Sequence, residues 1–115
     1  MNIFQRWIMK QYTNESQTAK LIELGFEKPA SIALVEPIYG MGGISVAKDY
    51  AIGELIDMLP ENVSQRIRYV ATKRAWVVDA DVLGKDGRCY YGCYHRELIE
   101  ALYVTIIKLK EEGVI

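Results

Sequence analysis

The stretch AWVVDADVLGKDGRCYYGCYH, residues 75–95, decides the fold because residue types alternate along much of it. A period of two is typical of β-strands, whose successive side chains point to opposite faces of a sheet. The turn signal GKDG at 84–87 predicts that the chain reverses there into a returning strand over 88–94. One face of the first strand is then formed by Trp76, Val78, Ala80 and Val82, and the other by Val77, Asp79 and Asp81.

An earlier stretch with the same period, RIRYVAT at 66–72, predicts a third strand. Lys73 and Arg74 separate it from residue 75, so a hairpin is expected there. The three strands would form an antiparallel meander, and residues 31–36 could add a fourth strand. One face of such a sheet is polar, and the other needs helices to cover it. The alternation places Tyr69 and Trp76 on the covered side.

Three amphipathic segments predict those helices. The first covers residues 15–24, where Asn14 caps the helix, Gln17 completes a capping box and Gly25 ends it with Phe26 folding back on Leu21. The second covers residues 52–59, with Asp49 as its candidate cap and Pro60 at its end. The third begins near residue 97; its apolar side is formed by Leu98, Leu102, Ile106 and Leu109. A short helix is also expected at residues 3–12.

Length and composition indicate one α+β domain over residues 1–115. Half of the residues are apolar and a quarter are charged, which is typical of a globular chain. No apolar run approaches the roughly 20 residues of a membrane helix. The beginning of the chain lacks a cleavable signal pattern, and two cysteines are too few for a disulfide framework. The expected location is therefore the reducing cytoplasm, with no membrane association.

The segment CYYGCYH, residues 89–95, contains both cysteines and the single histidine. In a strand, Cys89 and Cys93 lie roughly 13 Å apart, too far to share a zinc ion or form a disulfide. Cys93 and His95 lie about 6–7 Å apart, too far for direct proton transfer. Asp79 and Asp81 are interpreted as ordinary acids of a solvated face. The sequence therefore predicts no catalytic residue, metal site or cofactor.

A glycine-rich segment, YGMGGIS at 39–45, invites comparison with phosphate-binding loops. It lacks the Gly-Lys-Ser/Thr ending of such loops, and Lys48 comes too late to replace it. We expect a flexible turn here, and whether it binds a ligand stays open at the level of sequence.

The charge distribution gives the most specific functional candidate. The chain has a net charge of −1, yet residues 66–96 contain seven Lys/Arg against three Asp/Glu. Arginine neutralises phosphate and aromatic rings stack on bases, so a face of the meander could bind single-stranded nucleic acid. The residues expected to do so are Arg66, Arg68, Lys73, Arg74, Arg88 and Tyr90.

Several segments together carry a resemblance. YTNESQTAKLIELGFEKP (12–29), YAIGELIDMLP (50–60) and ELIEALYVTIIKLKEEGVI (97–115) resemble a family of short uncharacterised proteins of gut Bacteroidales and of their phages and integrated elements. Members of that family usually have Ser or Thr where this chain has Ala51, which gives a capping box with the residue at Glu54. The resemblance implies an accessory protein of a mobile element and brings no catalytic residues.

Two functions therefore stay open at this stage. The preferred prediction is a non-enzymatic accessory or interaction protein of a phage or mobile element, whose partner is another protein or a second copy of itself in a homodimer. Eight tyrosines and two tryptophans are many for this length, and exposed aromatic surface often marks contact sites. The alternative is a nucleic-acid-binding module that uses the basic, aromatic meander over residues 66–96.

Overall fold

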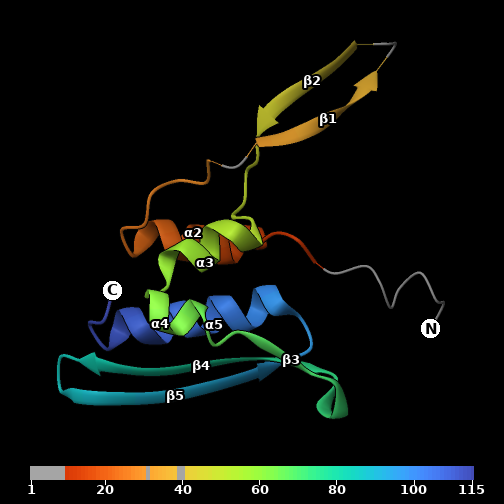
Figure 1. Cartoon of the computed structure of the whole chain (residues 1–115). Coiled ribbons are helices and arrows are strands. Elements are labelled where there is room, and N and C mark those ends of the chain that lie inside the picture. The colour runs from red at the N-terminus through yellow and green to blue at the C-terminus, as the bar shows by residue number, and fades with distance from the viewer. Residues whose placement is uncertain (1–9, 31, 39–40) are drawn as a thin grey trace.

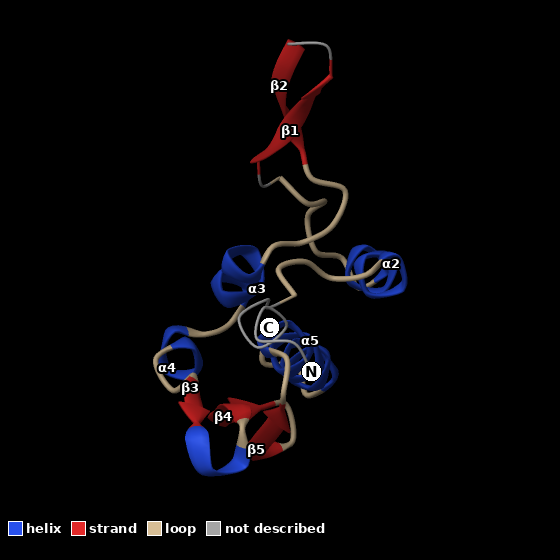
Figure 2. Ribbon diagram, turned by 90° about the vertical axis from the view of Figure 1, so that its right-hand side faces the viewer, coloured by secondary structure: helices blue, strands red, loops and turns tan. Residues whose placement is uncertain are grey.

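A computed structural model describes residues 10–30, 32–38 and 41–115. The described part has the predicted α+β architecture, with a meander covered on one face by helices (Figure 1). Figure 2 shows the layers: the meander, then α4 and α5, then α2 and α3. The helices are α2 (Glu15–Glu23), α3 (Ile52–Met58), α4 (Glu61–Ser64) and α5 (Leu98–Glu111), and the strands are β1 (Ile32–Ile38), β2 (Met41–Val46), β3 (Arg68–Val70), β4 (Ala75–Gly84) and β5 (Gly87–His95).

Helix α2 has the predicted ends. The Asn14 side chain accepts a hydrogen bond from the Gln17 backbone N–H at 2.8 Å, and the Gln17 side chain accepts one from the Asn14 N–H at 3.0 Å. At the other end Gly25 has a φ of +98°, and the Phe26 N–H donates to the Leu21 carbonyl at 3.2 Å. Backbone groups at both ends of α2 are thus hydrogen-bonded by the same residues from which the two ends were predicted. The helix predicted at residues 3–12 lies mostly outside the described residues.

Helix α3 corrects the predicted cap. Ala51 is the residue at the N-cap, with extended backbone angles, and Asp49 lies two residues too early to cap the helix. The Glu54 side chain accepts a hydrogen bond from the Ala51 N–H at 3.1 Å, but alanine has no hydroxyl to accept one in return. Half of a capping box is therefore formed. Pro60 ends α3 as predicted and also begins the unpredicted short helix α4.

Asp49 instead belongs to a polar cluster at the start of α2. The Thr18 hydroxyl donates to the Asp49 carboxylate at 2.5 Å and lies 2.7 Å from the Thr13 hydroxyl. The Thr13 hydroxyl also accepts a hydrogen bond from the Tyr50 N–H at 3.0 Å. The buried Tyr50 ring reaches further and donates its hydroxyl to the Glu27 carbonyl. These bonds tie the segment before α2 to the segment before α3.

Strands β3, β4 and β5 form the predicted three-stranded antiparallel meander. Tyr69 pairs with Trp76, and the register of β4 with β5 runs without interruption from Trp76–His95 to Gly84–Gly87. At the β3–β4 turn Arg74 adopts the left-handed conformation, with a φ of +49°. Within the described residues no helix is long and apolar enough to cross a bilayer.

Residues 32–46 depart from the prediction. Residues 32–38 do form a strand, but β1 pairs with β2 in a separate two-stranded sheet and does not join the meander. The glycine-rich segment is also more regular than expected, because residues 41–46 form β2. Figures 1 and 2 show this β1–β2 hairpin projecting away from the helices.

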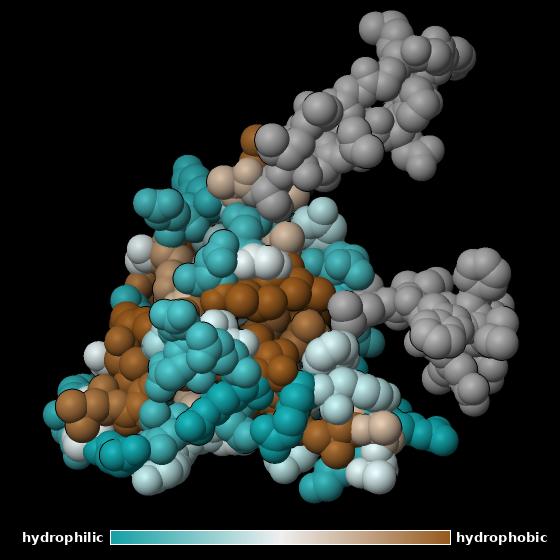
Figure 3. Space-filling view, in the orientation of Figure 1, coloured by the Kyte–Doolittle hydropathy of each residue, from teal (hydrophilic) through white to brown (hydrophobic). Residues whose placement is uncertain are grey.

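The core extends from the meander past α5 to α2 and α3, where Leu21 and Leu55 are fully buried. Val78, Ala80 and Val82 of β4 are buried against α5, as the alternation predicted. Figure 3 shows apolar side chains reaching the surface between the α2–α3 layer and α5. The apolar side of α5 is buried along its length, at Leu98, Ile99, Ala101, Leu102, Ile106 and Leu109.

Candidate functional site

The cysteine segment is part of a regular strand. Position 89 pairs with Val82 and Cys93 with Val78, so the two cysteine positions follow one extended backbone. Burial raises the pKa of the Cys93 thiol, which favours the protonated, unreactive form. His95 accepts a hydrogen bond from the Glu97 N–H at 2.9 Å through Nδ1, at the start of α5. Among the residues that the structure describes, no three His, Cys, Asp or Glu side chains are grouped to hold a metal ion.

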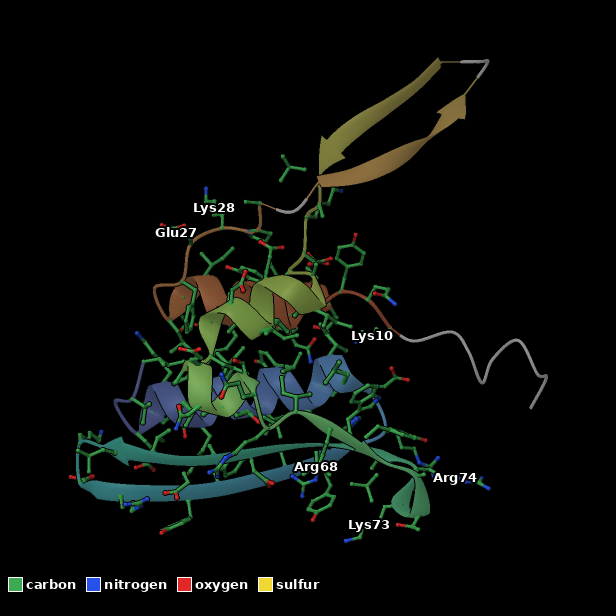
Figure 4. The ribbon with its side chains drawn as sticks, in the orientation of Figure 1. Lys10, Glu27, Lys28, Arg68, Lys73 and Arg74 are labelled. Atoms are coloured by element: carbon green, nitrogen blue, oxygen red, sulfur yellow. The ribbon has the colours of Figure 1, made fainter. Side chains whose placement is uncertain are left out.

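The chemically richest surface is the side of the meander that faces away from the helices, which we call the outer face. Along each strand, side chains of the outer face alternate with side chains that face the core, because successive residues of a pleated strand point to opposite sides. Figure 4 shows Arg68 and Lys73 directed to this side. Its members on the strands are Arg68 and Val70 of β3, Ala75, Val77, Asp79, Asp81 and Leu83 of β4, and Arg88, Tyr90, Gly92 and Tyr94 of β5.

Two ion pairs link the strands across the outer face. Arg68 donates from an Nη to the Asp79 carboxylate at 2.6 Å. Arg88 binds Asp81 through two nitrogens, at 2.7 and 3.0 Å, in the two-pronged geometry that suits guanidinium and carboxylate. These hydrogen bonds lower the pKa of Asp81. Two arginines expected to bind phosphate thus already have anionic partners.

Aromatic rings flank these ion pairs. The Lys73 ammonium lies 4.5 Å from the centre of the Tyr94 ring, and the Arg88 guanidinium lies 5.6 Å from the centre of the Tyr90 ring. Both distances are within the range of cation–π attraction. The outer face therefore combines exposed aromatic rings with charges of both signs.

The burial of Val77 and of Tyr69 differs from what strand alternation alone predicts. Val77 is fully buried although it lies on the outer face, between its paired neighbours Arg68 and Tyr94. Tyr69 was expected to face the core, and its ring does lie 5.3 Å from that of Trp76. It is nevertheless 52% exposed, because β3 is a three-residue edge strand. The expectation of a core position for Tyr69 was wrong, while Trp76 packs against the core.

A hollow of about 370 Å³ opens on the outer face above Gly92. Gly92 pairs with Asp79 and has no side chain, so the surface is depressed between Arg66 on one side and Tyr90 on the other. A Cβ atom at position 92 would lie 3.3 Å from the Asp79 carboxylate. A glycine inside a tyrosine-rich strand is the feature of the sequence that could have indicated this hollow.

The structure brings most of the predicted nucleic-acid residues together. Arg68, Lys73, Arg88 and Tyr90 share the outer face, and Arg66 lines its hollow. Arg74 lies apart, at the left-handed end of the β3–β4 turn, and Figure 4 shows its side chain extending beyond the sheet. The sequence did not indicate that Asp79 and Asp81 would bind two of these arginines.

Comparisons with protein-family models, with curated proteins and with solved structures give no match. The resemblance to short proteins of Bacteroidales and their mobile elements stays a prediction. The functional argument therefore depends on the chemistry of the outer face.

Proposed function

We propose that the protein is a non-enzymatic accessory protein that binds another protein through the outer face of its meander. The observation that carries this proposal is the exposure of large side chains there: Leu83 is 79% exposed, Tyr90 72% and Tyr94 53%. Tyrosine and arginine are enriched in the centres of protein interfaces, where rings supply area and guanidinium groups supply directed hydrogen bonds. The resemblance to proteins of phages and mobile elements supports the same kind of role.

The proposal includes the absence of catalytic activity, which the surroundings of the candidate catalytic side chains support. The candidate nucleophile Cys93 has a raised pKa because it is partly buried. The imidazole of His95 is engaged with the Glu97 backbone, and Asp79 and Asp81 are bound by arginines. These four side chains, which could act as nucleophile, base or metal ligand, therefore each have a structural reason for their place.

Nucleic-acid binding is the second candidate, supported by an excess of positive charge. Arg66, Arg68, Lys73, Arg74 and Arg88 outnumber Asp79 and Asp81 by three charges (five minus two). A phosphate would have to compete with the carboxylates for two of these cations, Arg68 and Arg88. That competition favours a protein partner, whose own polar groups can join the existing ion pairs.

Site-specific photo-crosslinking in cells that naturally contain the protein tests the proposal. A photoreactive phenylalanine at Leu83 on the outer face should give discrete adducts with another protein. The same group at Ile22, which is 38% exposed on α2, is the matched control and should not give those adducts. Adducts common to both positions, or none from position 83, would refute binding through the outer face.

The second candidate is tested with labelled single-stranded DNA and RNA. Saturable binding by the purified chain that weakens steeply between low and moderate salt would favour nucleic acid, because phosphate contacts release counterions. Arg68→Gln and Arg88→Gln should then weaken it. We expect no such binding at low salt.

A further inference from the structure

Strand β5 forms a long unprotected edge of the meander. All nine of its residues pair with β4 on one side, and no described element pairs with it on the other. The remaining edge of β4 is different, because the Asn62 side chain of α4 donates to the Asp81 carbonyl at 3.4 Å. Proteins commonly guard open edges with proline, bulges or several charges. Strand β5 has no proline or bulge, and Arg88 is its one Lys, Arg, Asp or Glu.

The register identifies the backbone groups at this edge. In an antiparallel pair, the residues of a strand direct their N–H and C=O groups alternately to one side and to the other. The Gly84–Gly87 pair closes a two-residue turn, so the odd-numbered residues of β5 bond to β4. The four even-numbered residues, Arg88, Tyr90, Gly92 and Tyr94, therefore present their backbone groups outward.

We infer that this edge pairs with β5 of a second copy of the chain, antiparallel about a twofold axis at Tyr91. This inference goes beyond the proposed function, because it concerns the β5 edge and a second copy of the chain instead of the outer face and another protein. In this register Arg88 of one copy is opposite Tyr94 of the other, and Tyr90 is opposite Gly92. All four outward residues of each strand are then hydrogen-bonded, and the meanders join into one six-stranded sheet.

The side chains are self-complementary in this register and less so in its neighbours. Tyr90 of each copy projects over Gly92 of the other, where the hollow provides space for a ring. Arg88 meets the Tyr94 ring, a favourable cation–π pair. A shift of the axis by one residue would oppose Tyr90 to Tyr90 or Gly92 to Gly92, and the hollow would lose its occupant.

The helix side of the same edge carries an exposed apolar residue. Helix α5 packs along β5, and Lys108 and Glu111 lie near Tyr91 of that strand, so this side of α5 faces β5. Val104 lies one turn before Lys108 on that side and is 39% exposed, although most apolar residues of α5 are buried. A twofold axis at Tyr91 brings the two α5 helices together across the sheet, which gives Val104 a partner surface.

The cysteines offer a test of this register. Position 89 of one copy is opposite position 93 of the other in a non-hydrogen-bonded pair, with Cα atoms about 4.5 Å apart, which a disulfide can span. Copper-phenanthroline oxidation of the purified wild-type chain should give covalent dimers. Cys89→Ser and Cys93→Ser should each lose them, because the remaining cysteines lie about 13 Å apart. Mixing the two variants before oxidation should restore the covalent dimer.

Sedimentation tests the edge independently of the cysteines. Wild type should sediment as a dimer and Tyr90→Asp as a folded monomer, because the new carboxylate would lie beside the Asp79 and Asp81 carboxylates that line the hollow of the other copy. Leu83→Asp, on the same face but on β4, is the matched control and should remain dimeric. Monomeric wild type at every concentration overturns the inference, as does crosslinking by either serine variant alone. A monomeric wild type would not affect the photo-crosslinking at position 83 to another protein. The two experiments therefore distinguish failure of this inference from failure of the proposed function.

Discussion

At the scale of single residues, Glu100 connects three parts of the chain. Its carboxylate accepts hydrogen bonds from the Lys10 ammonium at 2.9 Å and from the Gln17 amide at 2.7 Å. Burial acts to raise the pKa of Glu100, but these hydrogen bonds and the positive charge of Lys10 together outweigh it, and the pKa is lowered. A carboxyl group with a lowered folded-state pKa stabilises the fold above its unfolded pKa of about 4.3. This contribution is lost as the pH falls through the folded-state pKa.

Glu100→Gln should therefore reduce the free energy of unfolding by about 1–2 kcal/mol at pH 7, as expected for hydrogen bonds to a charged group. The difference from wild type should shrink as the pH falls below 4. Urea unfolding at several pH values measures this, and Lys10→Met in a double-mutant cycle isolates the pair. A pH-independent difference would show that the charge of Glu100 is not involved.

Residue-scale predictions from sequence succeeded where neighbours in the chain decide the outcome. Asn14 and Gln17 form their capping box because both partners lie within one turn. Asp49 was misassigned because Thr18, 31 residues away in sequence, binds its carboxylate. The burial of Val77 likewise depends on Arg68 and Tyr94, which belong to other strands. Interactions set by the sheet register are invisible to a periodicity argument.

At the scale of elements, α3 is the helix with an incomplete start. Glu54 forms its half of a capping box, but the Ala51 side chain has no oxygen that could accept a hydrogen bond from the backbone N–H groups of the first turn. Ala51→Thr should supply that acceptor. Ala51→Val is the control, because valine has the same shape without the hydroxyl.

We expect Thr at position 51 to exceed Val in free energy of unfolding by about 1 kcal/mol, the usual contribution of an N-cap. The extended backbone of Ala51 suits both branched side chains, so packing changes should cancel in the comparison. Denaturant unfolding of both variants measures the difference. Equal stabilities would mean that water already satisfies the first turn of α3.

Helices and strands were predicted correctly where the sequence has a clear periodicity, and missed where it does not. The meander and α5 follow from clear periods of two and of 3.6. Helix α4 has four residues, too few to show a period, and was not predicted. Strand β2 was missed because Gly42 and Gly43 disfavour a strand on propensity alone, whereas pairing with β1 stabilises it.

At the scale of the whole molecule, the β1–β2 hairpin is an appendage of the helix-covered meander. Its two strands contact each other far more than any other described element, and both ribbon views show it apart from the helices. An isolated two-stranded hairpin is at best marginally stable in water. The fold of residues 48–115 should therefore not depend on it.

Replacing residues 33–45 with an Asn-Gly turn tests this independence. Ile32 and Val46 are register partners, so their Cα atoms lie about 5 Å apart and a two-residue turn can connect them. The free energy of unfolding should change by less than about 0.5 kcal/mol, as for surface changes away from the core. Leu55→Ala, at a fully buried position of α3, shows the sensitivity of the measurement and should cost about 2–5 kcal/mol. A loss comparable to that of Leu55→Ala would instead make the hairpin a structural part of the domain. Because the helices lie between β5 and the replaced hairpin (Figures 1 and 2), the shortened chain should also keep the wild-type pattern of cysteine crosslinks.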